Sequence, residues 1–168
     1  MTSFRIRPIE PADNAGAAAV IRTVMPEFGC TGEGYSINDP EVNDLYAAYA
    51  DIRSRFYVVE ELPTGRVVGC GGITQLRGAA TTVCELQKMY FLDVARGRGL
   101  GERLLRQCLG DAARLGYTYC YLESVAAMRA AARLYRKVGF AALAAPMGDT
   151  GHGKCDRFYG AALAPVYD

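Results

Sequence analysis

The sequence lacks an excess of charge of either sign. Its 168 residues include 19 Lys and Arg against 18 Asp and Glu, which gives a net charge of +1. Proteins that bind nucleic-acid backbones present a marked positive field. The charge balance therefore argues against general nucleic-acid binding. A hydrophobic fraction of 51% and a charged fraction of 22% are typical of a folded chain rather than a disordered one.

A long apolar run is also lacking. A helix that crosses a bilayer needs about 20 consecutive apolar residues. The longest candidates here, such as residues 141–147, are short and rich in alanine. No apolar signal core follows Arg5 and Arg7 near the N-terminus. We therefore expect neither a membrane protein nor an exported one, and we expect a cytoplasmic location.

Paired cysteines are lacking as well. The six cysteines lie far apart without a Cys-x-x-Cys pair: Cys30, Cys70, Cys84, Cys108, Cys120 and Cys155. Four of them lie in apolar strand or helix patterns, where a free thiol behaves as a small hydrophobic side chain. The single histidine, His152, lacks the second histidine or cysteine pair of a zinc site. We predict reduced, non-catalytic thiols, no metal, and a position for His152 near a substrate or a subunit interface.

The length fits one domain, which we expect to span residues 3–166. Alternating and β-rich runs predict strands over residues 4–7, 55–60, 66–74, 83–92 and 117–122, with a final hairpin within 140–163. Helical patterns and start signals predict helices over residues 13–24, 40–50, 99–115 and 128–138. The predicted order is β-α-α-β-β-β-α-β-α-β-β.

The most informative segment is the glycine-rich turn of residues 96–102, between a predicted strand and a strongly periodic helix. Glycines let the backbone approach a ligand closely, and the free N–H groups of a first helical turn favour an anion. Arg96 and Arg98 add positive charge, although an ordinary basic turn is the alternative. The segment has no P-loop sequence, and its Gly-x-Gly-x-Gly pattern differs from the dinucleotide fingerprint. A nicotinamide or flavin site is therefore disfavoured.

Two motifs resemble those of the GNAT superfamily of acyl-CoA-dependent N-acyltransferases. The family's Arg/Gln-x-x-Gly-x-Gly/Ala signature is matched by Arg96, Gly99 and Gly101. Its Leu-Tyr-x-x-x-Gly-Phe element is matched within residues 134–140. Both motifs have the family's order and spacing, and the predicted element order fits over nearly the whole chain. The resemblance implies an α/β (α+β) fold, with a GNAT-like mixed, largely antiparallel central sheet flanked by helices.

The resemblance also implies acetyl-CoA as the cosubstrate. The backbone of the turn would hold the coenzyme A pyrophosphate, and the end of the preceding strand would pair with the pantetheine amides as an added strand does. The Phe91 N–H would then donate to the acetyl carbonyl oxygen. The implied cofactor-binding residues are Met89, Tyr90, Phe91, Arg96, Gly97, Arg98, Gly99, Leu100, Gly101 and Glu102. Where the family often has Asn at the start of the last helix, this sequence has Met128, which lacks the amide for that contact.

Acetyl transfer to an amine needs a neutral amine, a stabilised oxyanion and a proton for the departing thiolate. Tyr135 resembles the family's general acid, with packing of its apolar stripe as the alternative role. Glu85 and Glu123 are the candidate bases, because apolar neighbours raise the pKa of a carboxylate. Alternation puts Glu85 on the same face as Phe91, although a β-bulge would break that count. We rank Glu85 above Glu123, and a solvated or ion-paired carboxylate is the alternative for each.

Residues 84–91 and 150–152 look like a bacterial subfamily of small-molecule acetyltransferases. We therefore expect an N-acetyltransferase that acts on a small amine or amino-acid-like acceptor, by direct transfer in a ternary complex. The acceptor site would be walled by the 28–38 loop, the Glu85 strand and the 148–155 hairpin. Acetylation of a protein N-terminus or lysine, or non-catalytic sensing of acyl-CoA, are the alternatives. The expected partner is the small acceptor, with no nucleic acid and no membrane, and the sequence allows a homodimer.

Overall fold

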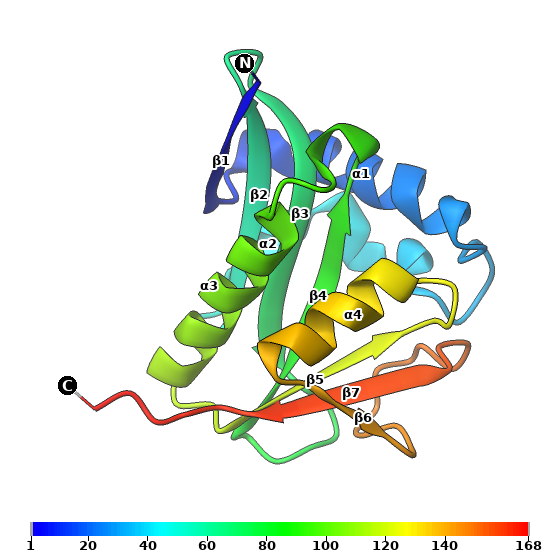
Figure 1. Cartoon of the computed structure of the whole chain (residues 1–168), viewed down its shortest axis with the longest axis vertical. Coiled ribbons are helices and arrows are strands. Elements are labelled where there is room, and N and C mark those ends of the chain that lie inside the picture. The colour runs from blue at the N-terminus through cyan, green and yellow to red at the C-terminus, as the bar shows by residue number, and fades with distance from the viewer. Residues whose placement is uncertain (1, 168) are drawn as a thin grey trace.

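The chain folds around one mixed sheet. The computed structural model describes residues 2–167 and contains a seven-stranded sheet of order β1-β2-β3-β4-β5-β7-β6. The strands are β1 (Ser3–Pro8), β2 (Arg55–Leu62), β3 (Arg66–Gln75), β4 (Val83–Phe91), β5 (Tyr119–Ser124), β6 (Ala141–Leu143) and β7 (Arg157–Ala162). The pair β4 and β5 is parallel, and the other pairs are antiparallel. The predicted mixed, largely antiparallel sheet is confirmed (Figure 1).

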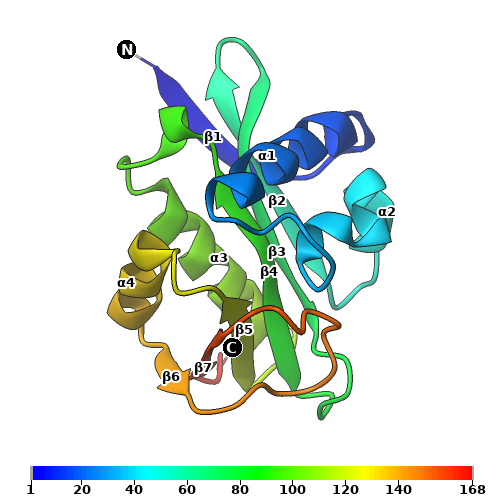
Figure 2. The same ribbon diagram turned by 90° about the vertical axis from the view of Figure 1, so that its right-hand side faces the viewer.

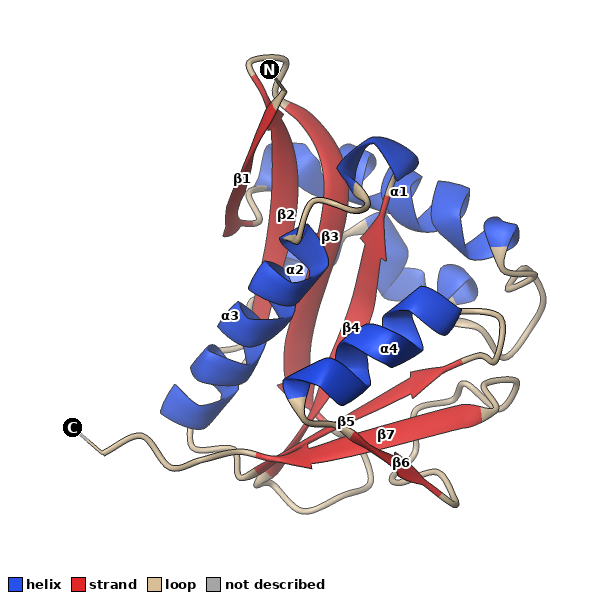
Figure 3. Ribbon diagram, viewed as in Figure 1, coloured by secondary structure: helices blue, strands red, loops and turns tan. Residues whose placement is uncertain are grey.

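Helices cover both faces of this sheet. The α-helices are α1 (Asn14–Glu27), α2 (Leu45–Ala48), α3 (Leu100–Arg114) and α4 (Arg129–Val138). The 3-10 turns are η1 (Pro11–Asp13), η2 (Ser36–Asn38), η3 (Pro40–Asn43) and η4 (Asp93–Ala95). Helices α3 and α4 lie on one face, and α1 and α2 on the other (Figures 2 and 3). Within the described part of the chain, every helix is too short or too polar to span a bilayer.

The order of the main elements agrees with the prediction, but the predicted helix over residues 40–50 is interrupted. It consists of η3 and the four-residue α2, separated by Asp44. The Asp44 backbone departs from helical geometry, with φ −148° and ψ 73°, and its side chain accepts a hydrogen bond from the Ala47 N–H. An Asp that caps the following turn in this way competes with a continuous helix.

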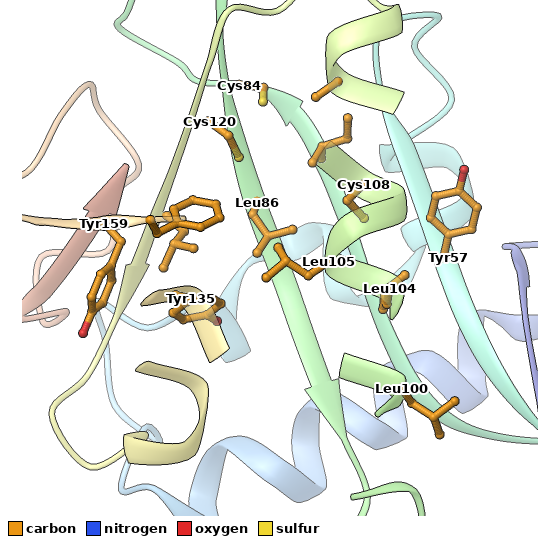
Figure 4. Close-up of a cluster of buried hydrophobic side chains, with 14 of the residues drawn as sticks. Tyr57, Cys84, Leu86, Leu100, Leu104, Leu105, Cys108, Cys120, Tyr135 and Tyr159 are labelled. Atoms are coloured by element: carbon orange, nitrogen blue, oxygen red, sulfur yellow. The ribbon is translucent and has the colours of Figure 1, made fainter. Parts of the chain in front are cut away.

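Each face of the sheet has its own apolar core. The core under α3 and α4 includes Tyr57, Leu86, Leu100, Leu104, Leu105 and Tyr135 (Figure 4). The core under α1 and α2 includes Ile21, Val24, Leu45, Tyr49 and Phe56. In α3 the buried residues recur at helical spacing, so one stripe of the helix faces the sheet. Gly116, with φ 89°, follows the end of this helix in a left-handed conformation that suits glycine.

A β-bulge at Lys88 divides β4 into two parts. Lys88 has φ 54°, which is uncommon for a residue other than glycine, and the register of β4 against β3 shifts at this point. Leu86 before the bulge and Met89 and Phe91 after it all contact the core under α3 and α4. Because neighbouring side chains alternate, Glu85 points to the opposite face from Phe91. The bulge weighed as an alternative is present, and the shared face expected from simple alternation is wrong.

Strands β4 and β5 pair only at their beginnings and then diverge. Their parallel pairing joins residues 83–85 to residues 119–121. Figure 1 shows the two strands opening into a V, with α4 lying across it. The segment between α1 and α2 (the 28–44 segment) and the connection between β6 and β7 (the 144–156 connection) lie near each other. The Lys154 N–H of the connection, for example, is 3.4 Å from the Gly34 carbonyl oxygen.

Candidate active site

A groove of about 540 Å³ lies beside the end of β4, where β4 and β5 diverge. Its walls come from the end of β4, the turn before α3 and one side of α4. All of the predicted cofactor-binding residues except Arg98 line this groove. The predicted set is therefore brought together, with one exception, along a single depression.

The turn before α3 is open where a ligand would approach. Gly99 is the N-cap residue of α3, with φ 72°, and no side chain caps this end of the helix. Gly97 has φ 69°, and a Cβ atom built on either glycine would meet no atom within 4 Å. The first N–H groups of an α-helix have no partner inside the helix, and together with a left-handed glycine they form a site for an anion. The turn therefore fits a phosphate group.

The end of β4 offers further backbone donors. The Leu92 N–H donates to the Val68 carbonyl of β3, at 2.8 Å. Successive N–H groups of a strand point to opposite sides. The N–H groups of Met89 and Phe91 therefore point away from β3 and into the opening toward β5. An extended, amide-bearing ligand can pair there as an added strand would.

Of the two arginines that the sequence suggests for the groove, only Arg96 lines it. Arg96 lines the groove, but its guanidinium donates to the Phe91 carbonyl and to Glu27 Oε2, each at 2.8 Å. The Arg98 guanidinium lies over the ring of Phe4, 5.2 Å from its centre. The predicted contact between the Arg98 side chain and the cofactor therefore has no support in the geometry.

Two cationic residues of α4, Arg133 and Lys137, line the groove instead. The Lys137 ammonium is 2.6 Å from Glu102 Oε2, whereas the Arg133 side chain has no hydrogen bond or ion pair among the described residues. Sequence reasoning missed both residues. Their spacing of four residues places them on one side of the helix, and this spacing was the signal that the sequence offered for a cationic helix face.

Tyr135 projects from α4 into the opening between β4 and β5, with its hydroxyl end toward β4 (Figure 4). The residue is 6% exposed, and its ring packs against Phe140 and Tyr159 with ring centres 5.9 and 5.6 Å apart. Burial raises the pKa of its phenol well above the ordinary value. The phenol therefore stays protonated at neutral pH and can donate a hydrogen bond.

A second cavity, of about 530 Å³, is lined by residues of the 28–44 segment, β3, β4 and the 144–156 connection, and is called the larger cavity by contrast with the small pocket beside it. A smaller pocket of about 50 Å³ shares Glu85, Gln87 and His152 with this cavity, and Tyr90 and Met128 with the groove. The smaller pocket thus lies between the two. The three segments predicted to wall the acceptor site all contribute residues to these two hollows.

Glu85 lines both hollows and is 4% exposed. Burial raises the pKa of its carboxyl to about 7, and the nearby Glu123 adds to this effect. The Gln87 amide donates to Glu85 Oε2 at 2.7 Å, and this hydrogen bond and the charges of His152 and Lys88 oppose the rise. A carboxyl group with this pKa is about half ionised at neutral pH, as suits a general base.

Glu123 has a different environment, although it also lines the smaller pocket. Its Oε1 accepts hydrogen bonds from Thr150 Oγ1 at 2.7 Å and from Tyr121 Oη at 3.1 Å. The bond from Thr150 ties β5 to the 144–156 connection. The structure thus separates the two candidate bases, because two hydroxyl groups restrain Glu123 whereas a single amide contacts Glu85.

A charged cluster joins β4 to the two segments that cover it. The Lys88 side chain is 1% exposed, and its ammonium lies 3.0 Å from Asp39 Oδ2 and 3.5 Å from Glu41 Oε1. His152 Nε2 is 2.9 Å from the same Asp39 oxygen. Burial lowers the pKa of His152, but the hydrogen bond and charge of Asp39 outweigh it and leave the pKa raised. Sequence reasoning missed Lys88 and Asp39, although a lysine inside a predicted buried strand was a signal.

The cysteines and the remaining polar groups show no metal centre. All six cysteines are free, five of them buried. Across residues 2–167, no group of three or more His, Cys, Asp or Glu side chains could hold a metal ion.

Comparison with known proteins identifies the family. A profile described as the acetyltransferase (GNAT) family matches residues 19–140. The chain is 40% identical over 152 residues to a protein of Escherichia coli K12 named "Uncharacterized N-acetyltransferase YjgM". The aligned region covers 90% of this chain and 90% of that protein. The chain belongs to the GNAT acetyltransferase family. The resemblance drawn from the two motifs is confirmed.

Solved structures agree with the GNAT fold. The structure is similar to an acetyltransferase of the GNAT family from Staphylococcus aureus Mu50, with a TM-score of 0.79, 16% identity, and coverage of 96% of this chain and 100% of that one. It is also similar to a GNAT superfamily phosphinothricin acetyltransferase from Sinorhizobium meliloti, solved in complex with acetyl-CoA. In that case the TM-score is 0.74, with 22% identity and coverage of 95% and 88%.

In this GNAT acetyltransferase, Arg133 and Arg98 offer a matched test of the groove. Because Arg133 lines the groove and Arg98 does not, we expect Arg133→Ala to weaken coenzyme A binding by about 3- to 10-fold, with a reduced dependence on salt. Arg98→Ala removes the same charge and should change the affinity less. Calorimetric titration with coenzyme A at two salt concentrations measures both. A larger loss in the Arg98 variant would contradict the assignment.

Proposed function

We propose that this acetyltransferase moves the acetyl group of acetyl-CoA to the amine of a small acceptor, by direct transfer in a ternary complex. The observation that carries the proposal is the smaller pocket, which adjoins both the groove and the cavity that contains Glu85. A donor in the groove and an acceptor in the cavity would meet beside Tyr90 and Met128. Direct transfer requires such a junction.

The groove supports acetyl-CoA as the donor. Its open glycine turn fits the pyrophosphate, and Arg133 adds positive charge nearby. The N–H groups of Met89 and Phe91 suit the pantetheine amides and the thioester carbonyl. In this assignment the Phe91 N–H donates to the carbonyl oxygen as negative charge develops there. A single donor of this kind typically contributes about 3 kcal/mol to the transition state.

Two further side chains would assist the proton transfers. Glu85 accepts one proton from the protonated acceptor amine, directly or through water, and the neutral amine then attacks the thioester carbon. The attacking nitrogen gives up its second proton as the carbon–sulfur bond breaks, and that proton ends on the thiolate sulfur, while the Tyr135 hydroxyl stabilises the departing thiolate with a hydrogen bond. Glu123, held by Thr150 and Tyr121, keeps the 144–156 connection against β5. The cysteines have no role in this scheme, because five of the six are buried, and burial raises the pKa of thiols such as those of Cys70 and Cys108.

The size and covering of the larger cavity support a small acceptor. Small-molecule sites commonly measure roughly 300–1,000 Å³, and this cavity measures about 530 Å³. The contact between Asp39 and His152 joins the 28–44 segment to the 144–156 connection at the cavity wall. A protein N-terminus or a lysine would need a more open channel for its flanking backbone. The similar enzyme from Sinorhizobium meliloti is named for a small acceptor, which agrees with this choice.

A screen for thiol release tests the proposal. Acetyl-CoA is incubated with the protein and pools of amines, amino acids and peptides, and the products are identified by mass spectrometry. We expect release with one or more small primary amines and an N-acetylated product. Release with peptides alone would favour a protein acetyltransferase. Tight coenzyme A binding without turnover in any pool would favour a sensor.

The pH profile of Glu85→Gln tests the base. Because ionised Glu85 is the active form and its pKa is about 7, kcat/KM of the unmodified enzyme should rise with pH through about 7. Glu85→Gln should lose this rise and lower kcat/KM at pH 8 by roughly 10²-fold or more. Glu123→Gln, which changes the neighbouring carboxylate in the same way, should keep the rise. An unaltered profile in Glu85→Gln would exclude Glu85 as the base.

A further inference from the structure

We infer that Gln87 and Tyr49 are positioning residues, which hold one oxygen of Glu85 and direct the other toward the acceptor amine. The inference rests on the proposed function, because it assumes that Glu85 is the base. Neither residue stands out in the sequence. Gln87 reads as an ordinary strand residue, and Tyr49 lies far from the glycine turn.

The three side chains form one chain of hydrogen bonds. The Tyr49 hydroxyl donates to Gln87 Oε1, and Gln87 Nε2 donates to Glu85 Oε2 at 2.7 Å. The direction of these hydrogen bonds follows from Glu85, because an ionised carboxylate can only accept. The amide NH₂ group of Gln87 therefore faces Glu85, which leaves the amide oxygen to accept from Tyr49. Burial raises the pKa of the Tyr49 phenol well above its ordinary value, so the phenol keeps the proton that it donates.

Tyr49 and Gln87 are both held in place by the surrounding structure. Tyr49 is 7% exposed, belongs to the core under α1 and α2, and packs on Phe56 with ring centres 4.6 Å apart. Gln87 follows Glu85 by two residues and precedes the Lys88 bulge. The side chains of Glu85 and Gln87 therefore lie on the face of β4 that lines the larger cavity. After the bulge, Phe91 lies on the other face of the sheet.

This arrangement commits only one oxygen of Glu85. Oε2 accepts from Gln87, whereas Oε1 has no hydrogen-bond partner within residues 2–167. Glu85 lines the larger cavity and the smaller pocket, so Oε1 is the oxygen left to accept a proton from an acceptor. An amide donor also stabilises the ionised carboxylate. Loss of that donor should therefore raise the pKa of Glu85 further.

Other titratable groups surround Glu85 and are left unchanged by the test. They are Lys88 on β4, Tyr121 and Glu123 on β5, His152 on the 144–156 connection, and Asp39 and Glu41 on the 28–44 segment. His152 is titratable and its charge acts on Glu85, so the signal of Glu85 must be assigned directly. The signal that disappears in Glu85→Gln provides that assignment.

The test measures ionisation of Glu85 without any acceptor. Protein labelled with ¹³C at the glutamate side-chain carboxyl is titrated by NMR between pH 4 and 10. We expect Gln87→Met, which keeps the length of the side chain and removes the donor, to raise the pKa of Glu85 by about one unit. Tyr49→Phe should raise it less, because the amide remains but is no longer oriented. Tyr46→Phe, which changes a tyrosine on α2 just before Tyr49 that is 45% exposed, is the control and should leave the pKa of Glu85 unchanged.

Rates with the best small amine of the screen complete the test. A rise of one unit from a pKa near 7 reduces the ionised fraction at pH 7 from about one half to about one tenth, so turnover should fall about fivefold and recover near pH 9. Unchanged titration in Gln87→Met and Tyr49→Phe would overturn the positioning inference and leave the base role intact. A shifted titration combined with a wild-type rate profile in Glu85→Gln would instead overturn the base role. Equal loss of rate at every pH in Gln87→Met would indicate structural damage and contradict the inference.

Discussion

Tyr135→Phe is expected to lower turnover by roughly 10²–10⁴-fold while leaving coenzyme A affinity nearly unchanged. The substitution keeps the ring packed between Phe140 and Tyr159 and removes only the hydroxyl group. With ordinary pKa values near 10 for a phenol and 8.5 for a thiol, proton transfer to the thiolate is uphill by about 2 kcal/mol. Burial raises the pKa of Tyr135 and makes full transfer harder. The phenol therefore acts by donating a hydrogen bond as the thiolate departs.

Tyr159→Phe is the matched control for this prediction. Tyr159 is 2% exposed and lies in the same core, with its ring next to that of Tyr135. Removing its hydroxyl should leave turnover within about twofold of the unmodified enzyme. Turnover with the best amine and coenzyme A affinity are measured in all three proteins. Near-normal turnover in Tyr135→Phe would show that water or another group serves the departing thiolate and that Tyr135 only packs in the core.

The second large effect is expected at Gly99. Gly99→Val places a branched side chain at φ 72°, in the open space of the turn, where the phosphate groups would approach. Each hydrogen bond to a charged group is worth about 1.5–3 kcal/mol. If the new side chain keeps the phosphate from two backbone N–H groups of the turn, coenzyme A binding should weaken by roughly 10²-fold or more. Calorimetric titration with coenzyme A measures the loss directly.

Gly116→Val controls for backbone strain. Gly116 has φ 89° and open space around it, like Gly99, but it follows the other end of α3 and does not line the groove. Both variants should lose stability in thermal unfolding, because a branched residue is strained at positive φ. Only Gly99→Val should lose coenzyme A affinity. Equal affinities in two folded variants would refute the assignment of the groove.

The sequence by itself determined the features that depend on short segments. The apolar stripe of α3, closed by Gly116, and the β-rich runs on either side of it follow from local periodicity, and so does most of the element order. The glycine turn of residues 96–102 was also recognisable, because backbone freedom and a helix start are encoded within a few adjacent residues. These local signals were sufficient for the family and for the position of the groove.

The tertiary structure decided which side chains meet. The bulge at Lys88 reversed the face of β4, since a single inserted residue changes every later side-chain direction. Arg133 and Lys137 of α4 line the groove, whereas Arg98 does not, because the side chain of Arg98 follows the turn toward Phe4.

Long-range contacts set the environment of the candidate base. Gln87 receives its hydrogen bond from Tyr49, 38 residues away, and His152 meets Asp39 across 113 residues. Such pairs depend on strand register and on how two covering segments cross the sheet, and no local pattern encodes either one. The sequence therefore identified Glu85 as a candidate among apolar neighbours, whereas its orienting partner and its separation from Phe91 came only from the fold.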